Sequence, residues 1–348
     1  MISSSQNRRQ EDEHDVEAKA LIKNLIAFAR EKGLCRLDLS ATDAGYGLYG
    51  KLGFREKERR YRDMRLTLDT HRDRREGKMN IGIIGYGSMG KMLARKFLES
   101  GLAGKDSLFV SNRTKERLNE IADKATVCAS NSEAAENAGI LFVCVRPCDI
   151  KEVVAEINGS LKKDSLLVSL NGNIMFDMLE KIAPRKIAKV IPSVTAEINR
   201  SQTLVCWNSQ VLDSDKENLR TLLGCMGEVM ELPENEMGMG SELVSCMPGL
   251  IASMFDVICR AAKSHTALPE EQIVRMLLKT VSATANLMEQ KQMSFQDVVS
   301  RVATKGGITE EGTKVIYEMF PNTAEEMFVR TLEKRWLTAE KAGESFQS

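Results

Sequence analysis

Three glycines near residue 85 form the pattern with the most direct chemical meaning in this sequence. Gly85, Gly87 and Gly90 follow the apolar run 80–84 with the spacing Gly-x-Gly-x-x-Gly. The first glycine permits a tight turn, the second lets the backbone approach a pyrophosphate, and the third lets a helix pack on the strand. The amides at the start of that helix would face the pyrophosphate. The pattern predicts a dinucleotide-binding loop made of Gly85, Tyr86, Gly87, Ser88, Met89 and Gly90.

The end of the next apolar strand indicates which cofactor this loop would take. Asn112 lies 22 residues after Gly90, where an NAD site usually carries Asp or Glu for the ribose 2′-hydroxyl. Here a neutral side chain is followed by the cation Arg113, and this combination suits a 2′-phosphate. We expect Ser111, Asn112 and Arg113 to bind the cofactor, and the cofactor to be NADPH. NADH stays an alternative, because Arg113 can equally be a surface cation.

A further strand end carries proline, which stops a strand and frees the backbone before it to face a ligand. Val145, Arg146 and Pro147 close the predicted strand 140–145. In a doubly wound sheet this strand reaches the nicotinamide end of the cofactor, so all three residues are predicted to bind it. Ser193 directly follows a proline at the end of another predicted strand, 188–191.

A glycine pair near residue 306 is the candidate substrate site. Gly306 and Gly307 precede a predicted helix, 313–320, and Thr309 lies close to its start. The exposed N–H groups there would seat a substrate carboxylate, and the Thr309 hydroxyl could donate a hydrogen bond beside it. An ordinary helix N-cap is the alternative role for Thr309.

Alternating strand and helix patterns must position these residues. Nearly every strand is a continuous apolar run, which indicates burial on both faces and an α/β fold with a doubly wound parallel sheet. The predicted strands are 80–84, 108–111, 140–145, 166–170, 188–191 and 203–207, and helices are predicted at 115–122 and 150–157. We expect residues 79–235 to form this NADP-binding Rossmann domain.

Strand patterns end near residue 236, and apolar helices follow. One is predicted over 250–262, and Pro269 would open the next from its first turn. Ser294–Asp297 and 323–326 resemble capping boxes. These helices are more apolar than one small domain can bury, so we expect 236–348 to form a homodimer or a higher homo-oligomer.

Composition excludes several classes of function. Lys+Arg and Asp+Glu both number 49, so no net charge attracts nucleic acid or a membrane surface. No apolar run was expected to span a bilayer, and the N-terminus lacks the apolar core of a signal peptide. The three histidines are far apart and no Cys-x-x-Cys pair occurs, so no metal site is expected. We expect reduced cysteines, a cytoplasmic protein and a small-molecule substrate.

Residues 1–68 carry a different pattern. A helical repeat ends near Gly33, a strand pattern follows at 36–41, and LYGKLGF occupies 48–54 before a last strand pattern at 61–68. This order resembles the C-terminal half of GNAT acetyltransferases, in which the tyrosine of the motif, Tyr49, is the candidate proton donor. The family's pyrophosphate loop is replaced by acids and by Val16, so we expect a truncated fragment without acetyltransferase activity. The charged run 69–78 indicates a linker.

From residue 79 to about 336 the chain resembles pyrroline-5-carboxylate reductases. The resemblance rests on IGIIGYGSMG at 81–90, SNR at 111–113, FVCVRP at 142–147, RKIAKVIPS at 185–193, SCMPG at 245–249 and VATKGGITEEG at 302–312. It implies a Rossmann domain followed by a helical dimerisation domain. It also implies a substrate site at which the helical part comes from the partner chain.

The resemblance further implies a reaction. NADPH would deliver hydride to the imine carbon of Δ1-pyrroline-5-carboxylate and give proline. The N–H groups of Gly306, Gly307 and Ile308 would hold the substrate carboxylate, and Thr309 would be the catalytic residue that hydrogen-bonds the ring nitrogen. Lys305 stands where the family has proline and adds a cation beside the carboxylate seat.

Three departures keep other functions open. Lys305, Ser193 in place of an asparagine, and Cys246-Met247 in a glycine-rich segment are more similar to reductase-like proteins of late-competence operons. An NADP-binding protein with a competence-related or regulatory role and little turnover is therefore one alternative. The other is a β-hydroxyacid dehydrogenase, for which the nearest candidate pair, Lys279 and Asn286, has the wrong spacing.

Overall fold

The chain was analysed as a computed structural model that describes residues 22–31, 36–41, 46–57, 62–67 and 79–347. It forms two compact units, Met1–Lys78 and Met79–Ser348. The expected charged linker, the altered pyrophosphate loop around Val16, and Gly33 lie outside the described residues.

The first unit is a small α/β fragment. A helix over residues 22–31 and α2 (Tyr46–Lys51) accompany three antiparallel strands in the order β1 (Arg36–Ala41), β3 (Arg62–Thr67) and β2 (Arg55–Lys57). Its described core is small and centres on Ile26, Ala29 and Phe54. Tyr49 packs edge-on against Phe54, with ring centroids 6.0 Å apart.

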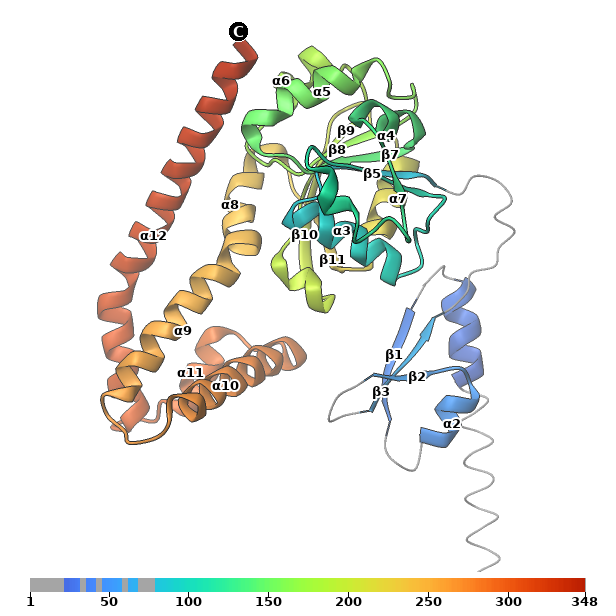
Figure 1. Cartoon of the computed structure of the whole chain (residues 1–348). Helices are drawn as coiled ribbons and strands as arrows, with labels where there is room; N and C mark the ends of the chain where they lie inside the picture. The colour runs from blue at the N-terminus through green and yellow to red at the C-terminus, as the bar shows by residue number, and fades with distance from the viewer. Residues whose placement is uncertain (1–21, 32–35, 42–45, 58–61, 68–78, 348) are drawn as a thin grey trace, which may run out of the picture. The chain divides into compact units, whose positions relative to one another are not determined.

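An eight-stranded sheet forms the centre of the second unit (Figure 1). Its strand order is β11-β10-β9-β8-β7-β4-β5-β6, so β4 lies between β7 and β5 and the order reverses beside it. A ligand is expected outside the carboxyl ends of the strands at such a reversal. The strands are β4 (Ile81–Ile84), β5 (Leu108–Ser111), β6 (Thr126–Val127), β7 (Ile140–Val143), β8 (Leu166–Ser169), β9 (Ile187–Ile191), β10 (Ser201–Trp207) and β11 (Gly227–Glu231).

Each face of this sheet has its own core, because successive strand residues point to opposite faces. On one face Ile83 and Phe142 pack with residues of α3 (Ser88–Glu99) and α7 (Asp213–Gly224). On the other face Ile84 packs with α4 (Asn131–Asn137), α5 (Ile150–Asn158) and α6 (Phe176–Ile182). The predicted doubly wound α/β fold is thereby confirmed.

The predicted parallel sheet includes one antiparallel pair of strands. Strands β4 to β9 are parallel, but β10 pairs antiparallel with β9, and β11 then runs parallel to β10. The apolar run of β10 shows burial and not direction, so its orientation was not visible in composition. Strands β6 and β11 were not predicted, because β6 has only two residues and β11 is largely exposed and lacks a continuous apolar run.

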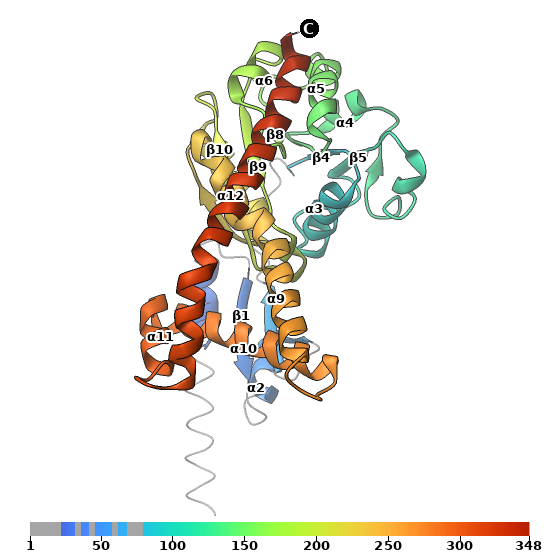
Figure 2. The ribbon, with the colours of Figure 1, turned by 90° about the vertical axis from the view of Figure 1, so that its left-hand side faces the viewer.

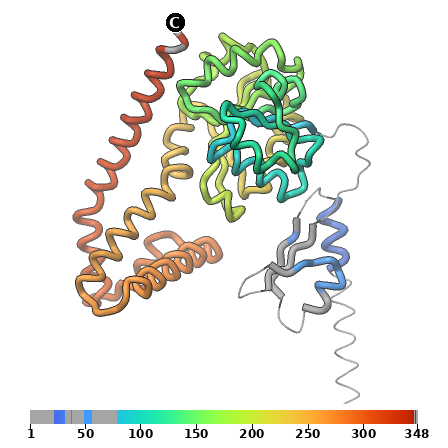
Figure 3. The backbone as a smooth tube through the Cα atoms, viewed as in Figure 1, coloured from blue at the N-terminus to red at the C-terminus, as the bar shows by residue number. Residues whose placement is uncertain are grey.

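Between β11 and residue 347 the described chain forms only helices. They are the 3₁₀ turn η4 (Glu234–Glu236), α8 (Met237–Ser241), the π-helical turn η5 (Glu242–Cys246), α9 (Met247–Lys263), α10 (Glu270–Lys291), α11 (Phe295–Val302) and α12 (Ile308–Gln347). Figures 2 and 3 show α9 leading away from the sheet to α10 and α11, and α12 returning toward it. We call these helices from α8 to α12 the helical lobe.

Several local predictions were wrong. The segment expected as helix 115–122 holds only the 3₁₀ turn η1 (Lys115–Leu118). The helix expected over 313–320 runs from Ile308 to Gln347 through Pro321, so the capping box predicted at 323–326 lies inside it. Pro269 is the N-cap of α10 and not a residue of its first turn. The capping box of Ser294 and Asp297 is confirmed.

The expectation that no apolar segment has membrane-spanning length also needs correction. The continuous helix Glu234–Lys263 is long and apolar enough by length and composition, with a mean hydropathy of 1.5 over its most apolar window. Only 6% of that window is buried within one chain. A second copy of the helical lobe would cover such a surface as well as lipid would.

Candidate functional site: a dinucleotide cleft

A cleft of about 620 Å³ opens at the carboxyl ends of β4, β5, β6 and β7. It lies where the strand order reverses, the place at which α/β sheets bind ligands. Its lining residues are Ile84, Gly85, Gly87, Asn112, Arg113, Thr114, Lys115, Arg117, Ala129, Ser130, Asn131, Cys144, Val145, Arg146, Asp149, Glu152, Val153 and Glu156. The structure therefore brings together the three segments that the sequence singled out for the cofactor.

The three glycines of the loop are required for different reasons. Gly85 has φ +95°, and a Cβ there would lie 2.6 Å from the Cys144 carbonyl oxygen. A Cβ on Gly90 would lie 1.9 Å from the Gly85 carbonyl oxygen. A Cβ on Gly87 would meet no described atom within 4 Å. The fold itself therefore demands Gly85 and Gly90, whereas the open space at Gly87 fits a pyrophosphate against the N-terminus of α3.

Asn112 is fixed in place by two hydrogen bonds. Its Oδ1 accepts from the Tyr86 backbone N–H at 2.9 Å, and its Nδ2 donates to the Thr114 carbonyl oxygen at 2.8 Å. This side chain therefore ties the glycine loop to the segment after β5. The neighbouring Arg113 is exposed and also lines the cleft.

Charges of both signs line the cleft. The Lys115 ammonium donates to the carbonyl oxygens of Cys128 and Ala129, whereas Arg113 and Arg117 make no side-chain hydrogen bond within the described part of the chain. Arg146 Nε donates to Asp149 Oδ2 at 3.0 Å. That bond lowers the pKa of the Asp149 carboxyl group. The cations that could bind a phosphate group therefore lie in the segment after β5.

Six of the predicted cofactor residues lie beside the cleft and not in its lining. Tyr86 and Gly90 are buried, while Ser88 and Met89 are exposed at the start of α3. The buried Ser111 hydroxyl donates to Asn131 Oδ1 at 2.7 Å, and Pro147 begins the turn η2 (Pro147–Asp149). Ser111 therefore acts through Asn131, which does line the cleft.

The sequence patterns did not reveal the part of the cleft that follows β5 and β6. Thr114, Lys115 and Arg117 follow β5, and Ser130 and Asn131 follow β6. A signal was available at Ser130, whose Oγ caps α4 by accepting from the N–H of the residue three positions later. Ser-x-x-Glu marks a helix start, and a helix start after a strand is where such sheets bind ligands.

The predicted substrate residues lie away from this cleft. The connection from α11 and the start of α12 hold these residues, none of which lines the cleft: Lys305, Gly306, Gly307, Ile308 and Thr309. Two of the expected amides already have acceptors: Gly306 N–H donates to an oxygen of Glu310 at 2.6 Å, and Gly307 N–H donates to the Thr304 carbonyl oxygen at 2.8 Å. The side chain of Ile308 is 95% exposed. One chain therefore does not unite the two predicted sites.

Ser193 has a local role. It is the N-cap of the turn η3 (Val194–Ile198), and its Oγ accepts from the Thr195 N–H. Serine and asparagine cap helices about equally well, so serine here preserves the cap. This departure therefore changes little in the backbone around it.

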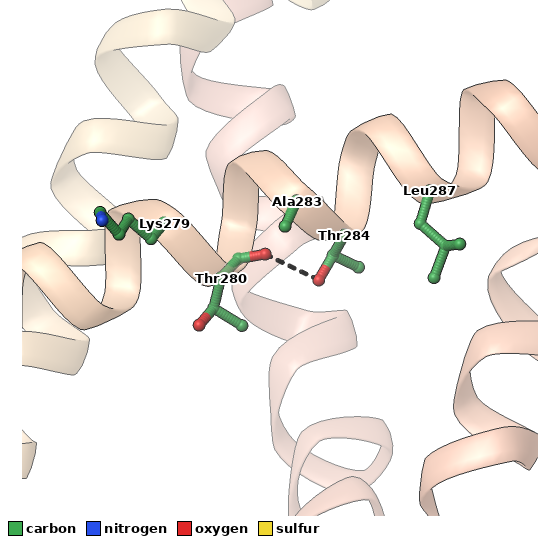
Figure 4. Close-up of a pocket in the computed structure, with 5 residues that line it drawn as sticks. All are labelled: Lys279, Thr280, Ala283, Thr284 and Leu287. Atoms are coloured by element: carbon green, nitrogen blue, oxygen red, sulfur yellow. Dashed lines mark hydrogen bonds between the residues drawn. The ribbon is translucent and has the colours of Figure 1, made fainter. Parts of the chain in front are cut away.

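The positions of the dehydrogenase alternative also lie on the helical lobe. Lys279 and Asn286 are seven residues apart on α10, and neither lines the cleft. Lys279 borders a shallow depression of about 340 Å³ (Figure 4). Its five lining residues all belong to this helix: Lys279, Thr280, Ala283, Thr284 and Leu287.

Comparisons with known proteins cover most of the second unit. Residues 80–172 match the family described as NADP oxidoreductase coenzyme F420-dependent. Residues 234–337 match the family described as pyrroline-5-carboxylate reductase dimerisation. These two stretches hold the cleft and the helical lobe.

Among solved structures, the pyrroline carboxylate reductase of Plasmodium falciparum with NADP bound has a TM-score of 0.67 at 21% identity. The alignment covers 76% of this chain and 98% of that one. The 1-pyrroline-5-carboxylate reductase of Streptococcus pyogenes has a TM-score of 0.67 at 19% identity, over 74% of this chain and 98% of that one. At these identities the likeness shows the fold.

Sequence relatives are more specific. ComE operon protein 4 of Bacillus subtilis is 27% identical, over 68% of this chain and 88% of the relative. Pyrroline-5-carboxylate reductase 3 of the same organism is 34% identical over 266 residues, 76% of this chain and 98% of the relative. This chain belongs to the pyrroline-5-carboxylate reductase family.

Proposed function

We propose that this protein reduces the imine of Δ1-pyrroline-5-carboxylate to L-proline with NADPH. The observation that carries the proposal is the cleft itself, in a chain of this family. Its glycine loop leaves open the space that a pyrophosphate needs, beside cations suited to a 2′-phosphate. The enzyme is then an NAD(P)H-dependent oxidoreductase acting on a CH–NH bond.

The Rossmann residues bind and orient the cofactor in this mechanism. The first amides of α3 and the open backbone at Gly87 would hold the pyrophosphate, and Arg113 and Arg117 would bind the ribose phosphate. Val145 and Arg146 line the cleft where the chain leaves β7. When bound, NADPH supplies the hydride, so the chain's task is to set the distance and angle at which the imine carbon receives it.

The substrate site would be completed by the loop 305–309 of a second chain. Its helix N-terminus would hold the substrate carboxylate, and the Thr309 hydroxyl would donate a hydrogen bond to the ring nitrogen as that atom gains a proton. The Glu310 carboxylate must first leave the Gly306 N–H if this amide is to bind substrate. Lys305 would add a positive charge near the incoming carboxylate.

Exposed apolar side chains on the helical lobe support a homo-oligomer. Ile316, Met319 and Trp336 on α12 are 57%, 67% and 61% exposed. The depression on α10 in Figure 4 has walls from a single helix, so its opposite wall is missing within one chain. Single copies of soluble proteins rarely expose so much apolar surface. A dimer through these helices, or a larger assembly, would cover it.

The deciding experiment is NADPH oxidation by the purified full chain with and without Δ1-pyrroline-5-carboxylate. We expect oxidation that depends on the substrate and yields proline. Cofactor binding without turnover would favour the alternative of a regulatory or competence-related NADP-binding protein. The occupied amides of Gly306 and Gly307 are the observation that keeps this alternative in view.

Thr309→Ala tests the substrate loop within the same assay. The variant should lose turnover on the order of a hundredfold or more, because the hydrogen bond it removes forms as the ring nitrogen becomes charged. The Kd for NADPH should stay unchanged, since Thr309 lies outside the cofactor cleft. Equal turnover of variant and parent would remove Thr309 from the mechanism.

The domain boundaries and location remain part of the proposal. We assign 1–68 to a GNAT-like fragment without acetyltransferase activity, 69–78 to a linker, 79–235 to the NADP-binding domain and 236–348 to the helical domain. The packing of Tyr49 against Phe54 supports a structural role for this tyrosine. Acetyl-CoA binding detected by calorimetry would overturn the inactive assignment. Free thiols, which suit the cytoplasm, occur at Cys128, Cys144, Cys148, Cys206, Cys246 and Cys259.

A further inference from the structure

A charged cluster joins the helical lobe to the sheet domain at Arg335 of α12. The guanidinium donates to Glu242 Oε1 through Nε at 2.9 Å and through Nη2 at 2.7 Å. Its Nη1 donates to Asn173 Oδ1 at 2.9 Å, and Nη2 also reaches the Ser241 hydroxyl at 3.0 Å. One side chain thereby connects α12, the junction of α8 with η5, and the loop after β8.

Glu242 makes this cluster more than a surface ion pair. Its side chain is 1% exposed, and it begins the π-helical turn η5. Its Oε2 is buried and has no hydrogen-bond partner among the described residues. A buried carboxylate is costly unless a cation neutralises it, and Arg335 does so here. Because π-helical turns recur at functional sites, this arrangement suggests a functional role for the pair of Glu242 and Arg335.

The loop after β8 leads from this cluster to the cofactor cleft. Asn171 at its start is buried, and its Nδ2 donates to the Val145 carbonyl oxygen at 3.1 Å. Val145 lines the cleft. Asn173, two residues further along, accepts from Arg335. A short run of backbone therefore separates the bond to the cleft wall from the bond to α12.

A second contact holds the far end of the same loop. The fully buried Lys189 ammonium donates to the Ile174 carbonyl oxygen at 3.1 Å and to Glu234 Oε1 at 2.7 Å. The same Glu234 oxygen accepts from the Phe176 N–H at 2.8 Å. The loop is therefore held at Asn171, Asn173, Ile174 and Phe176, and of these contacts only that to Asn173 comes from α12.

We propose that Arg335 is a positioning residue, which fixes the loop 171–176 and through it the Val145 wall of the cofactor cleft relative to α12. The inference rests on the proposed function, because Val145 lines the cleft that would bind NADPH, whereas Thr309 of the same α12 would serve the cleft of a second chain. Arg335 touches neither cofactor nor substrate. Its role is to set the geometry in which hydride transfer takes place, where displacements near 1 Å can cost about a hundredfold in rate.

Asn173→Ala is the cleanest test, since it removes the bond to the loop and keeps the buried pair of Arg335 with Glu242. We expect kcat to fall on the order of tenfold with an unchanged Kd for NADPH, and the kinetic isotope effect with 4-deuterated NADPH to rise. Arg335→Lys keeps the charge but loses the fork, and should act in the same direction. Amide hydrogen exchange of residues 171–176 should become faster in both variants.

Arg330→Lys is the matched control, because it alters an exposed Arg–Glu pair one turn away on the same helix. It should change neither kcat nor exchange in the loop. Unchanged kcat and unchanged loop exchange in Asn173→Ala would overturn the inference. If Arg335→Lys lowers both the affinity for NADPH and the thermal midpoint but leaves the isotope effect unchanged, Arg335 has only a structural role.

The same measurements separate this inference from the proposed function. If the parent protein binds NADPH but does not oxidise it with Δ1-pyrroline-5-carboxylate, the proposed function fails. Hydrogen exchange of the loop would then still decide whether Arg335 holds it. If the parent turns over normally and the loop does not respond to Asn173→Ala, the function stands and the positioning role is lost.

Discussion

The sheet domain and the helical lobe differ in how much of their apolar surface is buried within one chain. Every residue of β4, β7, β8 and β9 is buried, in two cores that helices cover. In the described structure α9 and α11 have no buried residue at all, and α10 has only Ile273. The sheet domain thus buries its apolar side chains within one chain, whereas the lobe leaves most of its apolar side chains exposed, as the proposed homo-oligomer requires.

The largest expected effect comes from one substitution made in both regions. Phe142→Ala removes a fully buried ring that packs 5.4 Å from Phe97, and should lower the free energy of unfolding by about 3–5 kcal/mol. Phe295→Ala, at a residue 81% exposed, should change it by less than about 0.5 kcal/mol at low protein concentration. Urea unfolding checks both. A comparable loss at Phe295 would mean that the lobe has a core of its own.

Assembly gives the next largest effect. Ile316→Glu places a charge on an apolar residue of α12 that is 57% exposed, and should weaken self-association by roughly thirtyfold, about 2 kcal/mol. Leu212→Glu is the control, since Leu212 is 56% exposed but lies at the start of α7 in the sheet domain. Sedimentation equilibrium measures both. Equal weakening by the control would place the interface elsewhere.

Cofactor binding offers a smaller but more local test. Gly87→Ala should reduce affinity for NADPH by about tenfold, roughly 1.4 kcal/mol, because the added methyl group enters space left for the ligand. The thermal midpoint of the free protein should not move. Gly104→Ala, which also meets no atom within 4 Å but lies outside the cleft, should change neither quantity. Calorimetric titration with NADPH measures the affinities. Full affinity in Gly87→Ala would mean that this loop does not bind the pyrophosphate.

The smallest predicted effect is a change in the pH dependence of stability at alkaline pH. Burial, followed by the nearby Glu120 carboxylate, raises the pKa of Tyr86 to about 12, above its ordinary value of 10. The folded chain holds this proton longer than the unfolded chain, so stability should fall as pH rises from 10 to 12. Tyr86→Phe should reduce that slope and change little at pH 7. An unchanged slope would mean that other groups, such as buried thiols, dominate.

The sheet domain was far more predictable than the lobe, for a physical reason. Apolar runs and the glycine spacing are local signals, and they located the strands that carry the cleft. The direction of β10 depends on its pairing with β9, and α12 continues through Pro321, a residue type that usually ends or kinks a helix. Neither is encoded by a short stretch of residues. The cleft residues after β6 were missed because that strand has only two residues.

The candidate substrate site shows the same limit more sharply. The residues 305–309 were recognisable as a glycine loop before a helix, and the structure places them there. Their separation from the cleft within one chain could not be read from spacing, because sequence order says nothing of which copy supplies which side. The acceptors already held by the Gly306 and Gly307 amides were equally invisible, since they depend on side-chain placement.

The contrast among the three loop glycines has a consequence for how such chains diverge. Gly85 and Gly90 are constrained by neighbouring backbone, so selection for folding alone would retain them in a descendant that had given up its cofactor. A Cβ at Gly87 would meet no described atom within 4 Å, so this position would be free to change once binding no longer mattered. The identity of this one residue is therefore a marker that separates working members of a lineage from those that keep only the architecture.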